Sequence, residues 1–120
     1  MTLVDTSIWI DHIRARDDRL VTLLQDGQVL THPFVIGEIA LGSLRQRRVV
    51  LDLLSNLPRA KTATADEALH FIDEHTLAGT GVGYVDAHLL AAIRLTAGAI
   101  LWTRDKTLKR IADRIGVIAV

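Results

Sequence analysis

Short apolar segments that alternate with helix-forming stretches constrain the fold of this chain more than any other feature. These segments are too short to be helices. They are flanked by glycine, proline and aspartate, which are residues that commonly end or begin helices. We expect strands at 3–4, 28–31, 99–103 and 117–120, and a short strand at 61–63. Short apolar strands separated by helices predict a parallel sheet that is covered on both faces. The expected fold class is therefore α/β, a three-layer α/β/α fold with a short, mostly parallel central sheet.

Amphipathic stretches fill the intervals between these strands. The first helix should begin at Thr6 and bury Ile8, Trp9 and Ile13, and the stretch at 45–57 has an apolar side that includes Val49, Val50, Leu53 and Leu54. The other expected helices start near Asp17 and Pro33 or cover 66–77, 84–97 and 106–115.

Length and composition narrow the class of protein. A chain of 120 residues with 49% hydrophobic and 23% charged residues should form one domain over 1–120. The absence of cysteine excludes a disulfide framework and a thiolate zinc site. Without a secretory leader or an apolar run long enough to cross a bilayer, we expect a cytoplasmic protein and no membrane partner. The formal net charge is zero, so any indication of nucleic-acid binding must be local.

Two aspartates lie at the ends of predicted strands. Asp5 directly follows the first strand, and Asp105 comes just after the strand that ends at Thr103. In open parallel sheets, ligands bind beyond the carboxyl ends of the strands, so both aspartates are candidates for a site. Each also suits the first turn of a helix as a cap, and for either residue alone the capping role is the more common one.

Two further acids interrupt apolar helix faces. Asp86 falls within the apolar stripe that runs from Val85 to Ile93, and Glu38 lies on one helix face with Phe34 and Leu41. A carboxylate on such a face is costly unless an arginine, hydrogen-bond donors or a metal ion compensate its charge. No lysine or arginine is placed on either stripe, which favours a metal ion as the group that compensates the carboxylate charge. A site made only of oxygen ligands selects Mg²⁺ or Mn²⁺ over zinc.

Other polar residues are weaker candidates. The hydroxyls of Thr6 and Thr103 lie next to the two strand-end aspartates and are candidates to support the site, although helix capping is the more common use of such hydroxyls. The five histidines form no pair with metal-ligand spacing, so we assign them no ligand role.

Four segments of the chain together resemble the PIN-domain family, and within it the VapC toxins of bacterial toxin–antitoxin pairs. They are residues 3–11, 37–42, 83–90 and 101–105. These segments contain Asp5, Glu38, Asp86 and Asp105, which match the acidic positions of the family in order. The resemblance implies a PIN-like fold and a Mg²⁺-dependent endoribonuclease with these four acids as catalytic and metal-binding residues. It also implies a homodimer and a cognate VapB-like antitoxin that inhibits the enzyme by inserting a segment near the acidic groove.

Basic residues near this site are candidates to guide an RNA backbone. Arg104 and Lys106 are the nearest to the acids in sequence, and Arg45, Arg47 and Arg48 form a second small cluster. Such runs are more often solvated helix faces.

Two other function classes stay open on the sequence alone. A receiver-type signalling domain also collects aspartates and Mg²⁺ at strand ends, but the acids on apolar helix faces have no role in that scheme. A catalytically silent binding module would keep the fold and would bind metal without cleaving RNA.

Overall fold

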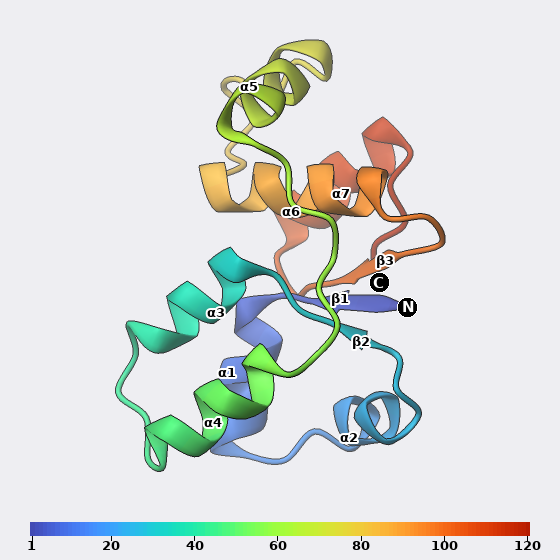
Figure 1. The fold of residues 1–120 in the computed structure, drawn as a ribbon. Helices are drawn as coiled ribbons and strands as arrows, with labels where there is room; N and C mark the ends of the chain where they lie inside the picture. The colour runs from blue at the N-terminus through green and yellow to red at the C-terminus, as the bar shows by residue number, and fades with distance from the viewer.

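A three-stranded parallel sheet lies at the centre of the protein, as the computed structural model of all 120 residues shows (Figure 1). The strands are β1 (Thr2–Val4), β2 (Val29–Leu30) and β3 (Ile100–Trp102). Their order is β2–β1–β3, and Leu3 of the central strand lies opposite Leu30 and Leu101. Because the strands are parallel, their carboxyl ends lie along one edge of the sheet.

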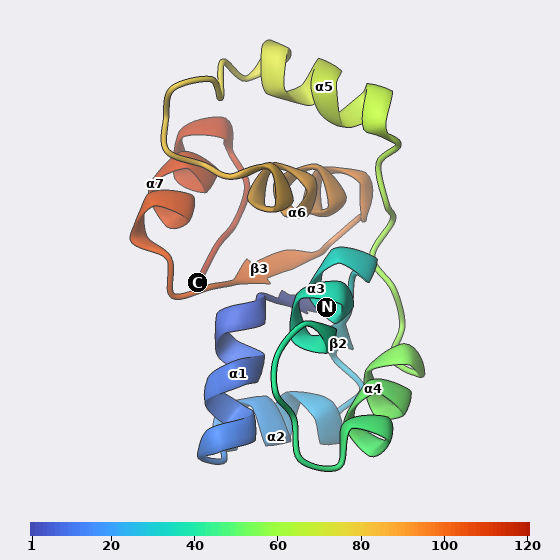
Figure 2. The same cartoon turned by 90° about the vertical axis from the view of Figure 1, so that its left-hand side faces the viewer.

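Seven helices surround the sheet and form the outer layers (Figures 1 and 2). They are α1 (Thr6–Arg14), α2 (Asp18–Gln25), α3 (Pro33–Ala40), α4 (Arg47–Ser55), α5 (Ala65–Glu74), α6 (Tyr84–Leu95) and α7 (Lys106–Ile115). Helices α6 and α7 cover one face with α5 outside α6, while α1, α2 and α4 lie on the other side and α3 packs against α1 and α4. The predicted three-layer α/β fold is confirmed. No helix is both long enough and apolar enough to cross a membrane.

The core forms where the sheet meets these helices. Leu3 and Val4 of β1 are completely buried, as are Leu89 and Leu90 of α6 and Leu101 of β3. Full burial of such a side chain contributes roughly 2 kcal/mol, so these contacts fix how α6 lies on the sheet.

The strand predicted at 61–63 is wrong in position and extent. The structure instead has one isolated parallel bridge between Thr31 and Arg59. The Thr31 amide donates to the Pro58 carbonyl at 2.8 Å and the Ala60 amide donates to the Thr31 carbonyl at 2.9 Å. The next amide, that of Lys61, donates to the Thr96 hydroxyl, so the ladder ends there.

The strand predicted at 117–120 is likewise reduced to one bridge, between Leu101 and Ala119. The Val117 amide donates to the Ala112 carbonyl at 2.8 Å to close α7, so it does not take part in a ladder. The segment still extends the pairing beyond β3, because the Val120 amide donates to the Leu101 carbonyl.

Some of the predicted buried helix faces are exposed. Ile8 and Trp9 are buried as expected, but Ile13 is 38% exposed. On α4 only Leu54 is fully buried, whereas Val49 and Leu53 are mostly exposed. The apolar sides of α1 and α4 therefore leave surface that no other part of this chain covers.

His32 begins α3 at the carboxyl end of β2. Its Nδ1 accepts a hydrogen bond from the Phe34 amide at 3.0 Å, and Pro33 occupies the first helical position. The side chain is fully buried, and burial together with positive charge at His88 and Arg59 lowers the pKa of His32 to about 4. A neutral imidazole is also required for Nδ1 to accept this bond.

The buried cap makes stability dependent on pH. Between the ordinary pKa of 6.5 and the folded value of about 4, the unfolded chain binds a proton at His32 that the folded chain does not. The free energy of unfolding should therefore fall by roughly 3 kcal/mol as the pH drops through this range. In His32→Asn, which keeps a capping side chain without titrating, urea unfolding should show a clearly smaller decrease.

The matched control is His70→Asn, because His70 is exposed on α5. This variant should keep the pH dependence of the unaltered protein. An unchanged dependence in His32→Asn would contradict the role given to this group.

Candidate active site

Asp5 and Asp105 both cap helices at the carboxyl edge of the sheet. Asp5 follows β1, and its Oδ1 accepts from the Thr6 amide at 2.7 Å. Asp105 follows β3, and its Oδ1 accepts from the Leu108 amide at 3.1 Å. The capping alternative is thus confirmed for both residues. Helix capping uses only one oxygen of each carboxylate, however, and leaves the other oxygen for further contacts.

Thr103 joins these two aspartates. It is fully buried, its hydroxyl donates to Asp5 Oδ2 at 2.6 Å, and its oxygen accepts from the Asp105 amide at 3.1 Å. The contact follows from strand pairing, because Val4 and Trp102 are direct partners in the β1–β3 ladder. The strand ends therefore bring together residues that are 98 positions apart in sequence.

Glu38 reaches the same edge from α3. The Thr6 hydroxyl donates to Glu38 Oε1 at 2.7 Å, so Thr6 links Glu38 to the cap residue Asp5. The expectation that Glu38 interrupts a buried stripe is wrong, because Glu38 is exposed and Leu41 is 90% exposed. The buried side of this short helix carries Val35 and Ile39 instead. Glu38 lies at the rim of the site.

Asp86 is half-buried in the first turn of α6. Its Oδ2 accepts from the Gly83 amide at 3.3 Å, which favours the charged form, yet the pKa of Asp86 is raised. The largest cause is burial, and the negative charges of Asp5, Asp105 and Glu38 add to it. Three carboxylates from three other parts of the chain thus influence Asp86. The structure brings all four predicted acids together.

No basic side chain neutralises this cluster. The three arginine–aspartate ion pairs and the His70–Glu74 contact of the structure involve other acids, and none includes Asp5, Glu38, Asp86 or Asp105. Four oxygen ligands with uncompensated charge are the donor set that suits a hard divalent cation. As the side chains stand, no group of three or more His, Asp or Glu could hold a metal ion. Each of the four already accepts a hydrogen bond from a threonine hydroxyl or a backbone amide, and a chelate would require some of these bonds to rearrange.

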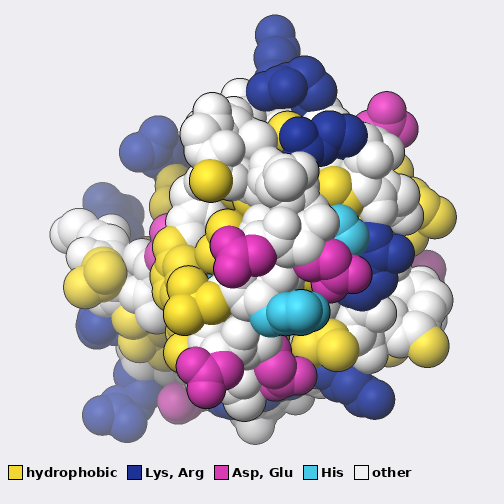
Figure 3. Space-filling model, turned by 90° about the horizontal axis from the view of Figure 1, so that it is seen from above, with side chains coloured by type: hydrophobic (Ala, Val, Ile, Leu, Met, Phe, Trp, Pro, Cys, Tyr) yellow, Lys and Arg dark blue, Asp and Glu magenta, His cyan; other side chains and the backbone are white.

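A second group of acids on α5 differs from this cluster. Asp66, Glu67 and Glu74 are exposed on the outer side of the molecule, where acidic side chains and histidine gather (Figure 3). The backbone amide and hydroxyl of Thr64 lower the pKa of Glu67, opposite to the change at Asp86. These α5 acids are a solvated and capped helix face, and burial distinguishes Asp86 from them.

The predicted RNA-binding residues occupy different surroundings. Arg104 donates to Asp11 at 2.6 Å and to Asp17 at 3.2 Å, so two carboxylates already share its charge. Lys106 is exposed in the first turn of α7. A role of either residue in RNA binding stays a prediction.

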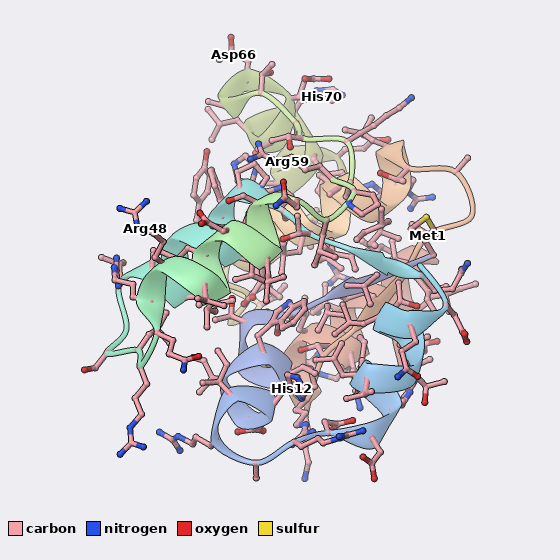
Figure 4. All side chains as sticks on the ribbon, turned by 60° about the horizontal axis from the view of Figure 1, so that its bottom comes forward. Met1, His12, Arg48, Arg59, Asp66 and His70 are labelled. Atoms are coloured by element: carbon pink, nitrogen blue, oxygen red, sulfur yellow. The ribbon has the colours of Figure 1, made fainter.

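The second basic cluster lies on and before α4. Arg45 lines an apolar groove together with Trp9 and Leu53, and Arg47 donates to the Gly42 carbonyl at 3.4 Å. Arg48 extends away from the body of the molecule (Figure 4). Here too, RNA binding stays a prediction.

Sequence analysis missed a ring cluster between α3 and α6, the helices that carry Glu38 and Asp86. His88 of α6 is 2% exposed, and its ring centroid lies 4.5 Å from that of Phe34 and 4.7 Å from that of Tyr84. The one available indication was spacing, because Tyr84 and His88 are four residues apart on one helix, as are Phe34 and Glu38. That pattern does not reveal that α3 and α6 meet.

Comparisons with known proteins show which family the chain is similar to. The family model described as PIN domain matches residues 2–114. The protein named Ribonuclease VapC32 from Mycobacterium tuberculosis is 54% identical over 117 residues, covering 98% of this chain and 94% of the relative. The same identity and coverage hold for the protein from strain CDC 1551 / Oshkosh and for that from strain ATCC 25618 / H37Rv.

Removal of one charge tests the electrostatics of the cluster. Because the pKa of Asp86 is raised above 3.8 in the folded state, its ionised form destabilises the protein at neutral pH and not near pH 3.8. In excess EDTA, Asp86→Asn should therefore have a higher free energy of unfolding than the unaltered protein at neutral pH. This gain should disappear toward pH 3.8, as measured by urea unfolding.

Asp52→Asn is the matched control, since Asp52 is an exposed acid of α4. Its free energy of unfolding should change by less than about 0.5 kcal/mol. A lower stability of Asp86→Asn at every pH would show that hydrogen bonding at Asp86 outweighs repulsion.

Proposed function

The chain belongs to the PIN-domain family, and within it to the VapC type, and from this premise we propose that it is an endoribonuclease, the toxin of a toxin–antitoxin pair. The observation that carries the proposal is the half-buried Asp86, whose pKa is raised by burial and by three neighbouring carboxylates without any basic partner. A site of this charge is suited to phosphodiester chemistry only with a cation. The relatives named ribonuclease support the same substrate class.

The four carboxylates would hold Mg²⁺, and Mn²⁺ should be able to replace it, because hard divalent cations prefer oxygen ligands. PIN nucleases generally use a divalent metal, and Mg²⁺ is our specific proposal. The chemistry that such a cation supplies is activation of a water molecule and neutralisation of charge on the phosphate.

The residues of the chain prepare this chemistry by orientation. Thr103 holds Asp5 Oδ2 and Thr6 holds Glu38 Oε1, each through a short hydrogen bond from a hydroxyl. These bonds limit the rotation of both carboxylates. Lys106, which is exposed one residue after Asp105, is the basic residue that we expect to contact the RNA backbone first.

The first test is loss of a single ligand. Asp5→Asn should keep the fold, because asparagine also caps helices. It should lower RNA cleavage in Mg²⁺ by more than the roughly 10- to 100-fold that loss of an outer-shell partner costs a metal site. Cleavage by the unaltered protein should stop in excess EDTA and return with Mg²⁺ or Mn²⁺, as followed on gels with a labelled RNA.

Asp52→Asn serves again as the control and should cleave normally. Full activity of Asp5→Asn, or cleavage that persists in excess chelator, would refute the assignment. Metal binding without any cleavage by the unaltered protein would favour the catalytically silent module instead.

The family resemblance implies an inserted antitoxin segment near the acidic groove, and a separate apolar groove is our candidate surface for a second part of the antitoxin. It has a volume of about 660 Å³, lies between α1, α2 and α4, and includes Trp9, Ile13 and Leu53. Leu53 is 65% exposed, and Arg45 provides a positive charge at the groove. An amphipathic segment with an apolar side and an acidic residue would complement it. A homodimer, which the family resemblance implies, stays a prediction.

A charge placed in this groove should release the antitoxin. Leu53→Glu should weaken inhibition by the VapB-like antitoxin at least tenfold, a cost that corresponds to about 1.4 kcal/mol. RNA cleavage without antitoxin should be unaffected, because the change lies outside the acid cluster. Leu69→Glu on α5, where the leucine is 55% exposed, is the control and should remain fully inhibited. Equal inhibition of both variants would place the antitoxin elsewhere.

A further inference from the structure

Tyr84 presents an aromatic ring at the start of α6, the helix that carries Asp86. It is the only tyrosine of the chain, begins α6 and is 49% exposed. Asp86 lies two residues later in the same helical turn and projects from a different side of the helix, so the contacts that link Tyr84 to the acid site run through His88 and Phe34. A half-exposed ring at the start of this helix is accessible to a ligand from solvent.

Tyr84 is part of a cluster that joins two helices, and we call Phe34, Tyr84 and His88 the aromatic cluster. The rings of Tyr84 and His88 meet edge to face, with an interplanar angle of 83°, and Phe34 of α3 packs on the same His88 ring. Phe34 precedes Glu38 by one helical turn. The two helices that supply Glu38 and Asp86 to the acid site thus also supply the rings beside it.

Polar atoms without partners lie beneath these rings. Neither ring nitrogen of the buried His88 has a hydrogen-bond partner, and Nε2 of the buried His32 has none either. The two imidazole centroids are 6.3 Å apart. Buried polar groups are normally hydrogen-bonded, so this seam between α3 and α6 holds hydrogen-bonding capacity that the chain itself does not use.

We propose that the aromatic cluster binds one unpaired RNA base beside the scissile phosphate, with the base stacked on Tyr84 and its polar edge bonded to His88. The inference rests on the proposed ribonuclease function. A nucleobase combines a flat aromatic face with a hydrogen-bonding edge, and unpaired bases are commonly recognised by stacking on aromatic side chains. The three side chains of the cluster are rings, so a flat aromatic ligand fits it better than a phosphate group. Because Phe34 and Tyr84 cover His88, the edge contact requires the exposed Tyr84 ring to turn outward.

Binding of modified oligonucleotides tests the stacking. All variants carry Asp5→Asn to prevent cleavage, and anisotropy in Mg²⁺ measures affinity for a fluorescein-labelled single-stranded RNA. One abasic nucleotide is then moved along the strand. With Tyr84 intact, one abasic position should lower affinity about fivefold or more, as expected for loss of one stacked base. Tyr84→Leu should lose a similar factor on intact RNA and should no longer respond to that abasic position.

Two controls separate stacking from other effects. Tyr84→Trp keeps an aromatic face and should retain both affinity and the abasic response. Leu95→Ala, at the far end of α6 where the leucine is 40% exposed, should behave like the parent. If Tyr84→Leu binds intact RNA as tightly as the parent, or keeps the abasic response, stacking on Tyr84 is overturned.

The edge contact has its own test. With each of the four bases placed in turn at the sensitive position, His88→Leu should reduce the differences in affinity among them. Unchanged differences would overturn the role of His88. Failure of the unaltered protein to cleave any RNA would refute the proposed function, whereas the binding results are obtained without cleavage and judge the base site separately.

Discussion

The register between β1 and β3 is the constraint on which the rest of the site depends. It sets Val4 opposite Trp102, so that the residues following both strands emerge together and Thr103 can donate to Asp5 across the strand ends. A slip by one residue would turn every side chain of β1 to the opposite face of the sheet. Full burial of Leu3, Val4 and Leu101 opposes such a slip, because apolar contacts on both faces would be lost. Core packing therefore secures the acid cluster, although no acid belongs to the core.

The strand-end aspartates perform two tasks with their two oxygens. In Asp5, one oxygen caps α1 and the other accepts from Thr103. As a helix cap, the Asp5 carboxylate is held in one position, where it stabilises α1. This position also keeps it next to the other negative charges of the cluster. Repulsion among the carboxylates thus lowers the stability of the fold, and the helix caps and the Thr103 hydrogen bond hold the carboxylates in place against it. Asp86 is half-buried and experiences the charges of the other three acids, and its raised pKa reflects the cost.

Local patterns in the sequence were sufficient for some of these features and insufficient for others. Asp5 and Asp105 could be placed because strand ends and helix starts are local, and parallel strands bring such ends to one edge. The exposure of Glu38 could not be predicted, because α3 is apolar on two sides and only tertiary packing selects Val35 and Ile39 as the buried pair. The strand at 61–63 failed for a similar reason, since the Lys61 amide is taken by a threonine far away in the sequence. The aromatic cluster forms where α3 packs against α6. The pattern of residues within one helix cannot predict which other helix it contacts.

Charge distribution explains why contacts to bases would matter in a nuclease of this composition. The chain has equal numbers of acidic and basic side chains, and Arg104, the arginine nearest to the acids in sequence, is already paired with Asp11 and Asp17. Affinity for RNA usually comes largely from lysine and arginine contacts to phosphates, and few of these groups are free beside this site. Four carboxylates add repulsion that a bound cation has to offset. Under these conditions stacking, which does not depend on net charge, is a source of affinity that remains, and Tyr84 offers an exposed aromatic ring on the helix that carries Asp86.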